Sequence, residues 1–212
     1  FGSLCNVKIS NENLSKLQEN LVKSHACGTG EEVPTAIVQL MLLLKIQSLS
    51  YGHSGVQLQT VERLVDFYNN AIYPVVYTLG SLGASGDLAP LAHLSLPLIG
   101  EGEVWMDGNI VLAKDAFEQK KLTPFAIRLR EGLAMMNGTS CMTGVGLVNL
   151  HYAEKLLNLS CLVSVTINEI LNAFDDHLSE ALNEVKLHEG QNAVAKIMRE
   201  LISESTLMRN RQ

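Results

Sequence analysis

The sequence is poor in aromatic residues and in cysteine. Aromatic side chains make up 5% of the 212 residues, whereas hydrophobic residues as a whole make up 47%. The core must therefore be built from leucine, valine, isoleucine, alanine and methionine, a composition that suits packed helices. The 4 cysteines lie far apart and form no Cys-x-x-Cys pair, which argues against a zinc ribbon and against the disulfide framework of a small secreted domain. A reducing, cytoplasmic compartment is therefore expected.

Long apolar runs and an excess of positive charge are also missing. No uninterrupted apolar stretch reaches the roughly 18 residues that a membrane-spanning helix requires, and the first residues show no signal-peptide pattern. The formal net charge is −6, from 16 basic and 22 acidic residues, and no basic stripe stands out. We therefore expect neither nucleic acid nor a membrane as a partner.

Apolar residues recur at helical spacing near the start of the chain. Leu14, Leu17, Leu21 and His25 share one face of a helix predicted for ENLSKLQENLVKSHA. Residues 26–33 are expected to form a loop, because ACGTGEEV carries no periodic pattern.

A second helix is predicted to follow, with Pro34 in its first turn, and to run to Gly52. It is apolar on nearly all sides, as is typical of a helix buried within a large core or an oligomer. Residues 60–69 predict a third helix.

The middle of the chain carries strand and turn signals. Residues 72–78 are expected to be extended, because Pro74 argues against a helix. LAPLAHLSLPLIG is predicted to be helical, with Pro97 kinking or ending the helix. EVWMDGNIVL predicts a β-hairpin, since Asp107 and Gly108 suit a type I′ turn between short strands.

From residue 125 to the end there is no proline, and apolar side chains recur at steps of three and four. The pattern predicts one long helix, or two with a break, of the kind that forms the spine of a bundle. A shorter helix is expected after the segment His188-Glu189-Gly190-Gln191. The recurring residues of the long pattern are Leu150, Ala153, Leu157, Cys161, Ser164, Ile167, Leu171, Phe174, Leu178 and Leu182.

The glycine-rich stretch GSLGASGDLAP, residues 80–90, does not fit the common phosphate-binding patterns. No lysine lies between Lys45 and Lys114, so a Walker motif is excluded, and G-x-G-x-x-G is absent. The nucleophile elbow G-x-S-x-G is missing too. Locally, Asp87 is the expected N-cap of a helix whose first turn is Leu88-Ala89-Pro90. That interpretation leaves Ala-Ser-Gly at residues 84–86 unexplained.

A small residue, a serine and a glycine in succession permit a reaction of the backbone. A tight turn can bring the amide nitrogen of Gly86 to the carbonyl carbon of Ala84. Ring closure with loss of water, and then loss of the Ser85 hydroxyl as a second water, leaves a five-membered ring with an exocyclic methylene. That product is an electrophile, and the helix start after Gly86 would favour negative charge developing there. The spacing permits this chemistry and does not by itself show it.

GSLGASGDLAPLAHLSLPLIGEGEV closely resembles the signature of the aromatic amino acid ammonia-lyases, most of all the histidine type. LVKSHACGTGEE, YGHSGV, REGLAMMNGTS and KLHEGQNAVA resemble further family segments, in the family order, so the resemblance covers essentially the whole chain. It implies that Ala84, Ser85 and Gly86 cyclise autocatalytically to 4-methylidene-imidazol-5-one (MIO), without an external cofactor. It also implies a mainly α fold, a long-helix bundle of the ammonia-lyase (fumarase/aspartase-like) type, with a small β-hairpin near residues 103–112.

The resemblance implies roles for three further residues. Asn137, in Met-Asn-Gly-Thr, matches the asparagine that hydrogen-bonds the prosthetic group; from the local sequence alone it is a turn residue before Gly138. His25, in Ser-His-Ala-x-Gly, matches an active-site histidine of the substrate pocket; taken alone it is a core histidine on an apolar face. Asp87 either serves only as the N-cap or also assists ring closure.

The remaining histidines are not expected to take part in chemistry. His188 matches a family segment but is given no catalytic role. The others do not pair with carboxylates at the spacing of metal ligands, so no metal site is predicted. Packing or surface positions are expected for His53, His93, His151 and His177.

The Ser24-His25 pair favours histidine as the substrate. Family members acting on histidine tend to carry Ser-His there, and those acting on tyrosine or phenylalanine tend to carry His-Leu or Phe-Leu, although some tyrosine aminomutases also resemble this chain with Ser-His. Cys141 and Met142 depart from the usual histidine-lyase pattern. The expected reaction is elimination of ammonia from L-histidine to give urocanate. The alternatives are a tyrosine or phenylalanine ammonia-lyase or aminomutase with the same MIO group, and a helical assembly module that does not catalyse.

The chain starts at Phe1 rather than at a methionine, and we expect it to be a piece of a longer polypeptide that lacks both ends. The resemblance implies that the catalytic tyrosine, the general base, precedes Phe1 and that further pocket residues follow Gln212, so these 212 residues alone are expected to be inactive. It also implies a homotetramer with shared active sites. We assign residues 1–136 to an MIO-bearing N-terminal region and residues 137–212 to the start of the central helical bundle, as one continuous folding unit.

Overall fold

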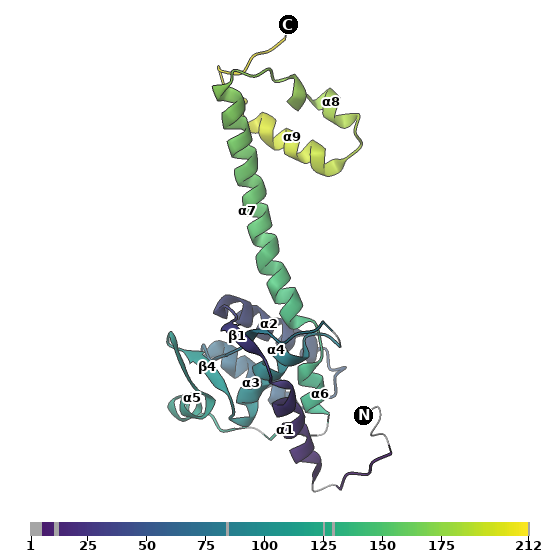
Figure 1. The fold of residues 1–212 in the computed structure, drawn as a ribbon, viewed down its shortest axis with the longest axis vertical. Coiled ribbons are helices and arrows are strands. Elements are labelled where there is room, and N and C mark those ends of the chain that lie inside the picture. The colour runs from purple at the N-terminus through teal and green to yellow at the C-terminus, as the bar shows by residue number, and fades with distance from the viewer. Residues whose placement is uncertain (1–5, 11–12, 84, 125, 129, 212) are drawn as a thin grey trace. The chain divides into compact units, whose positions relative to one another are not determined.

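The computed structural model describes residues 6–10, 13–83, 85–124, 126–128 and 130–211 (Figure 1). Most of these residues lie in helices, with short strands between them, and the mainly α class expected from the sequence is confirmed. The contacts divide the chain into two compact units, Phe1–Val148 and Asn149–Gln212. The assignment of regions made from the sequence stays a prediction. Ala84, the first residue of the triplet, lies outside the described residues.

Three helices that are far apart in the sequence pack against one another in the first unit: α1 (Leu14–His25), α4 (Leu88–Ser95) and α6 (Glu131–Met136). The four residues predicted to share one face of the first helix are half-buried, and the buried side chains among the described residues of α1 are Gln18 and Val22. The end of α1, the start of α4 and the end of α6 carry the predicted site residues, so this packing positions the site. The buried side chains that the three helices and the segment before α6 share are Val22, Ala92, Ile127 and Met136.

Helix α4 begins at Leu88, directly after the glycine-rich loop, as predicted. Residues 89–95 of this helix are all buried. The α-helical pattern ends at Ser95 and continues as a 3₁₀ turn, Leu96–Ile99, that contains Pro97. Proline has no N–H to donate to the preceding turn, which accounts for the predicted break.

Helix α2 (Thr35–Ser50) packs against α3 (Leu58–Asn69) in the main core of the first unit. Apolar residues surround α2 on nearly every side, but the burial predicted from that pattern is confirmed only in part, because one side of the helix is buried and Leu43 is 47% exposed. One charged side chain, Lys45, lies among the buried residues of the helix. The buried residues of α2 and α3 are Val38, Met41, Leu42, Lys45, Leu49, Thr60, Leu64 and Phe67.

The loop predicted for residues 26–33 is wrong in part, because it contains strand β1 (Thr29–Glu32). This strand pairs in antiparallel fashion with β3 (Tyr77–Leu79), and an irregularity interrupts the register. The sequence TGEE has neither alternation nor β-branched residues beyond its threonine. Its strand conformation comes from the backbone of a partner more than forty residues away, as is common for strand propensity.

A second small sheet has the order β2-β4-β5, formed by Tyr73–Pro74, Glu103–Met106 and Asn109–Leu112. Strands β4 and β5 are the hairpin predicted from the sequence. Asp107 and Gly108 have φ angles of 50° and 81°, and positive φ at both central residues is the type I′ geometry. Helix α5 (Ala113–Lys120) follows β5 and packs on this hairpin.

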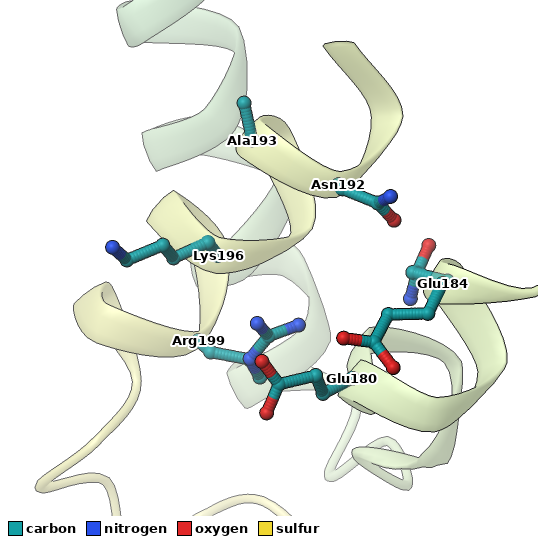
Figure 2. A pocket seen from close by; sticks show the side chains of 7 residues that line it. Glu180, Glu184, Asn192, Ala193, Lys196 and Arg199 are labelled. Atoms are coloured by element: carbon teal, nitrogen blue, oxygen red, sulfur yellow. The ribbon is translucent and has the colours of Figure 1, made fainter. Parts of the chain in front are cut away.

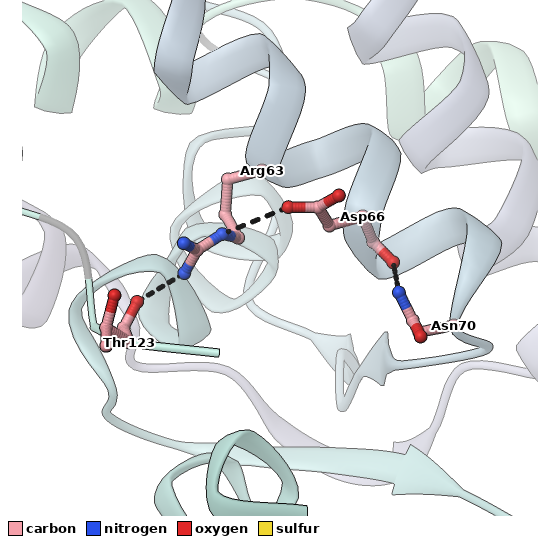
Figure 3. A network of polar contacts seen from close by, with 4 residues as sticks. All are labelled: Arg63, Asp66, Asn70 and Thr123. Atoms are coloured by element: carbon pink, nitrogen blue, oxygen red, sulfur yellow. Dashed lines mark hydrogen bonds and ion pairs between the residues drawn. The ribbon is translucent and has the colours of Figure 1, made fainter. Parts of the chain in front are cut away.

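A polar network fastens α3 to the chain that follows α5 (Figure 3). The guanidinium of Arg63 donates a hydrogen bond to the carbonyl of Thr123 and pairs with Asp66, with Nε and Oδ2 3.5 Å apart. The side chain of Asn70 donates to the carbonyl of Asp66 at 2.9 Å. Arg63 also lies 5.9 Å from the ring centroid of Phe117, so its aliphatic and planar parts both contribute to the packing.

Helix α7 (Ser140–Ile170) is 31 residues long and begins in the first unit. Of the two forms predicted for this region, the one with a break is correct: α7 ends at Ile170, and Asn172 has a φ of 47°. The later residues of the pattern belong to a 3₁₀ turn (Asp176–Leu178) and to α8 (Glu180–Glu184). No helix in the described part of the chain is both long and apolar enough to cross a membrane.

The second unit also contains the expected shorter helix, α9 (Glu189–Leu201), which begins within the segment 188–191 rather than after it. His188 is its N-cap, and its Nδ1 accepts a hydrogen bond from the backbone N–H of Gln191 at 3.0 Å. This satisfies one of the free N–H groups of the first turn. The His-x-Gly-Gln segment therefore has a local structural role here.

Candidate functional site

The described part of the triplet loop has an unusual backbone. Gly83, Ser85 and Gly86 have φ angles of 67°, 56° and 88°. A positive φ is routine for glycine but uncommon for serine, so Ser85 is held in a conformation that its own side chain disfavours. Ser85 is exposed, which leaves its hydroxyl free of the core. The described residues on both sides of position 84 therefore have positive φ angles, in the loop for which the resemblance implies ring closure.

The loop lies directly against Gly138, the residue after Asn137. Gly86 and Gly138 form a bridge between parallel segments, and the N–H of Asp87 donates to the carbonyl of Gly138 at 3.1 Å. A Cβ atom placed on Gly86 would come within 2.2 Å of that carbonyl oxygen. Gly86 must be glycine both for its φ and for this close approach. The structure thus brings the end of the triplet and the Asn-Gly segment together.

Asn137 ends helix α6. Its side-chain amide donates to the carbonyl of Leu133 at 2.8 Å, and its backbone N–H binds the same carbonyl at 3.0 Å. The residue is half-buried, and Gly138 follows it with a φ of 128°. Asn137 is thus the C-cap of α6 with an extended backbone (φ −88°, ψ 146°) rather than the turn residue considered from the local sequence, and its role toward the prosthetic group stays a prediction.

Asp87 stands at the N-cap position of α4, but the prediction that its side chain caps this helix is wrong. Its carboxylate instead accepts a hydrogen bond from the backbone N–H of Met142 at 2.8 Å, in the first turn of α7, and another from the hydroxyl of Ser81 at 3.3 Å. The side chain is buried. The first N–H groups of a helix lack intrahelical partners and attract negative charge, and α7 competes successfully for this carboxylate.

His25 is the last residue of α1 and is half-buried. Its Nδ1 lies 2.9 Å from the carbonyl oxygen of Leu21 and 3.1 Å from the hydroxyl of Ser24. Because a carbonyl can only accept, Nδ1 is the donor in the bond to Leu21. Both of these partners lie on α1, and no hydrogen bond joins His25 to Ser85 or Gly86 in the described part of the chain.

The segment that follows His25 does reach the loop. The N–H of Gly28 donates to Nε2 of His93 at 2.9 Å, and a Cβ on Gly80 would lie 3.0 Å from the Cα of Gly28. The ring of Tyr77 meets that of His93 edge-on, with centroids 5.1 Å apart. Burial lowers the pKa of His93, which keeps Nε2 free to accept. The packing role expected for His93 is confirmed, and it joins the end of α1 to the start of the loop.

Sequence reasoning missed Lys45. Its side chain is 2% exposed, and its ammonium donates to the carbonyls of Ala134 at 2.7 Å and of Asn137 at 2.6 Å. Burial lowers its pKa to about 8. A lone lysine within the apolar helix AIVQLMLLLKIQSLS was the available signal, because lysine is rarely buried without a specific partner.

Surface hollows border the Asn137-Gly138 segment within the first unit. One of them encloses about 460 Å³, which falls within the usual range for small-molecule sites. His53, expected at the surface, lies at its edge and is exposed. The residues lining this hollow are Ser48, His53, Ser54, Arg130, Leu133, Ala134, Asn137 and Gly138.

A pocket in the second unit lies between α8 and α9 (Figure 2). It contains none of the predicted site residues. Its charged side chains include both signs, and Arg199 already donates to the carbonyl of Leu178 at 2.7 Å. Asn183, also in its lining, accepts a hydrogen bond from Gln191 and donates to the backbone. Arg199 and Asn183 thus serve to hold segments of this unit together.

In the described part of the chain, neither the Cys141 thiol nor a metal-binding cluster contributes a reactive group to this site. Burial raises the pKa of the Cys141 thiol to about 11, with a smaller contribution from Asp87 nearby, so the thiol is unreactive at neutral pH. Within the described ranges, no group of three or more histidine, cysteine, aspartate or glutamate residues is arranged to hold a metal ion.

Comparison with known proteins gives consistent results. The family model described as aromatic amino acid lyase matches residues 1–212. The chain is 44% identical to histidine ammonia-lyase of Symbiobacterium thermophilum over 207 residues, which cover 98% of this chain and 41% of that protein. It is 43% identical to tyrosine 2,3-aminomutase of a Myxococcus species over 212 residues, which cover 100% of this chain and 40% of that protein.

The fold is also similar to solved structures. The crystal structure of tyrosine aminomutase from Streptomyces globisporus superposes with a TM-score of 0.92 at 32% identity, covering 99% of this chain and 40% of that one. The predicted fold type is therefore confirmed. The chain spans about 40% of the length of the relatives that it matches.

Proposed function

The chain belongs to the aromatic amino acid lyase family, as its motifs predicted, and we propose that the whole protein containing it eliminates ammonia from L-histidine to give urocanate. The observation that supports this most is the fold of the loop against Gly138. Ser85 and Gly86 turn with positive φ, and Gly86 lies too close to the Gly138 carbonyl to carry any side chain. A tight turn at Ser85 and Gly86, with no room for a side chain on Gly86, supports the proposed backbone cyclisation of Ala-Ser-Gly.

The residues present fit an MIO group formed from Ala84, Ser85 and Gly86. Ser85 is exposed, so its hydroxyl can leave as water. When formed, the ring supplies the electrophile that activates the substrate's amino group as a leaving group. Asn137 and the start of α4 would hold it, because α4 begins at Leu88 and the positive end of a helix dipole favours negative charge nearby.

The other residues of the site would orient the substrate and hold the loop in place. The hydrogen bond of Nδ1 to Leu21 holds the ring of His25, and we assign this residue the positioning of the substrate. Asp87 ties the loop to the start of α7. The general base that removes the β-proton would be a tyrosine outside these 212 residues, so the chain alone would not turn over.

Histidine is favoured as the substrate by the Ser24-His25 pair. Identity does not separate the candidates, because the histidine ammonia-lyase and the tyrosine aminomutase match at 44% and 43%. A tyrosine or phenylalanine lyase or aminomutase with the same group is the alternative within the family.

The test is product analysis of the whole protein with L-histidine, L-tyrosine and L-phenylalanine, combined with the mass of the peptide spanning residues 84–86. Urocanate and a peptide lighter by two water molecules are the expected results. Coumarate, cinnamate or a β-amino acid would move the assignment to the alternative within the family. An unmodified triplet and no turnover with any of the three would indicate a non-catalytic assembly module instead.

We further propose that the whole protein is a cytoplasmic homotetramer with active sites shared between subunits. Many apolar side chains of α7 are exposed in this chain, among them Leu150 and Leu156, and other bundle helices would cover them. The free thiols of Cys27, Cys141 and Cys161 fit a reducing compartment. Sedimentation of the whole protein tests the assembly, and a monomer would overturn it.

A further inference from the structure

Lys45 lies in the core of the first unit and takes no part in the function proposed above. It sits on α2 among buried apolar side chains and is itself 2% exposed. Transferring an ammonium group from water into such a core is costly unless it gains strong hydrogen bonds. The position of those bonds shows what the lysine does in the fold.

Both hydrogen bonds go to the end of one helix. The ammonium donates to the carbonyls of Ala134 and Asn137, at 2.7 Å and 2.6 Å, and these residues form the last turn of α6 and its C-cap. The final carbonyls of a helix have no intrahelical partner and carry partial negative charge, so a buried cation is well placed there. None of the ion pairs found among the described residues involves Lys45.

The backbone that Lys45 holds, at Asn137 and Gly138, is also the backbone against which Gly86 packs. Lys45 holds the carbonyl of Asn137 from the core side, and the N–H of Asp87 binds the next carbonyl, that of Gly138, from the loop side. A Cβ on Gly138 would lie 3.7 Å from Nζ of Lys45, so the ammonium adjoins both peptide groups. Gly86 then packs on the same Gly138 carbonyl. The carbonyls of two consecutive residues are thus each held by a donor, that of Asn137 by Lys45 and that of Gly138 by Asp87.

We propose that Lys45 is a positioning residue for conversion of the triplet and for the elimination: through Asn137 and Gly138 it holds the backbone surface against which Gly86 is pressed. This role rests on the proposed function. Among the described residues, the hydrogen bonds of Lys45 go to Ala134 and Asn137 and not to Ser85 or Gly86. Its effect is transmitted through one rigid turn, and small displacements of reacting groups have large effects on rate.

The test uses the whole protein with Lys45→Met and Lys45→Arg. Methionine keeps the length and the apolar stem but leaves both carbonyls without a donor, whereas arginine keeps donors and charge. We measure the rate at which the peptide spanning residues 84–86 loses two water molecules after synthesis, kcat and KM, and the thermal unfolding midpoint. Lys45→Met is expected to slow conversion and lower kcat of the converted fraction by about ten- to a hundredfold, with KM nearly unchanged. Lys45→Arg is expected to restore part of both rates.

A matched control separates this role from simple stability. Thr60 is also fully buried and polar, and its hydroxyl donates to Glu131 at the far end of α6 at 2.6 Å. Thr60→Val is expected to lower the unfolding midpoint but to leave conversion and kcat per folded molecule unchanged. If Lys45→Met does not fold, Lys45→Gln, with a single shorter donor group, is measured in its place and is expected to show the same loss.

The outcomes distinguish this role from the proposed function. Wild-type protein with a converted triplet, together with a Lys45 variant that converts and turns over at the wild-type rate, would overturn the role of Lys45 alone. The same holds if the variant loses rate only in step with its stability, as Thr60→Val would. A wild-type protein whose triplet keeps both waters would overturn the proposed function and this role together.

Discussion

The carboxylate of Asp87 accepts a hydrogen bond from the backbone N–H of Met142, 2.8 Å away. Asp87 directly follows the triplet and precedes α4, whereas Met142 lies in the first turn of α7. One buried carboxylate therefore joins the base of the loop to the start of a helix of 31 residues. The side chain of Asp87 was expected to cap α4, but it caps α7 instead.

Asp87→Ala should destabilise the first unit, because it leaves the N–H of Met142 and the hydroxyl of Ser81 without their acceptor. Loss of a helix cap typically costs about 1 kcal/mol, and up to about 2 kcal/mol. Denaturant unfolding of the whole protein measures this change. Asp115→Ala, at an exposed position of α5, is the control and should change stability by less than about 0.5 kcal/mol. Equal effects of the two substitutions would contradict the cross-helix cap.

Gly86→Ala should separate the loop from the Asn-Gly segment. The new Cβ would lie 2.2 Å from the carbonyl oxygen of Gly138, so one of the two segments must move. We expect no loss of water from the triplet of this variant. Gly83→Ala is a matched control, since Gly83 also has a positive φ but a Cβ there meets nothing within 4 Å. Gly83→Ala should lower the free energy of unfolding by about 1 kcal/mol through backbone strain. Its triplet should still lose two water molecules. Conversion of Gly86→Ala at the wild-type rate would show that this contact is dispensable.

The stability of the first unit should depend on pH through Glu131. Burial alone would raise the pKa of this carboxyl, but hydrogen bonds from Thr60, Arg128 and Gln57 outweigh it and lower the pKa below 4.5. A lowered pKa in the folded state means stabilisation that is present above the unfolded-state pKa and is lost as the pH falls through the folded-state value.

Urea unfolding from pH 7 down to pH 3 checks this dependence on Glu131. The free energy of unfolding of the wild type should decrease below about pH 4.5. Glu131→Gln should be less stable than the wild type at pH 7, and its free energy of unfolding should decrease less as the pH is lowered. Glu180→Gln, at an exposed position, should follow the wild-type curve. Parallel curves for the wild type and Glu131→Gln would refute the assignment.

The 212 residues expressed alone should self-associate, because α7 leaves large apolar side chains exposed. Leu150, Leu156 and Ile170 are 66%, 65% and 73% exposed, and contiguous apolar surface drives association. Sedimentation at several concentrations measures this. Replacing Leu150 and Leu156 by glutamate should shift the distribution toward smaller species. A monodisperse wild-type monomer would be evidence against the prediction.

Predictions from the sequence succeeded where the determinant is local. Periodicity located α1, α2 and α3, because a helix forms within its own segment and buries one face. Asp107-Gly108 indicated the hairpin turn, since two residues suffice to select type I′ geometry. The break at Pro97 followed in the same way from the missing N–H of one residue.

Predictions failed where a partner far away in the chain decides. Nothing in TGEE reveals the antiparallel pairing of β1 with β3. Nothing near Asp87 reveals that its carboxylate serves Met142 rather than its own helix. Lys45 was visible as a lone charge in an apolar helix, but its acceptors, Ala134 and Asn137, are about ninety residues away.

The sequence by itself determined the helical class, the hairpin, the family and the residue types of the triplet, because these depend on residues at short spacing. Only the tertiary structure decided which backbone lies against that triplet. Gly86 meets Gly138, Asp87 joins α7, and Lys45 holds the turn between them. The physical reason is that hydrogen bonds between distant segments depend on how whole helices pack, and no local pattern encodes that packing.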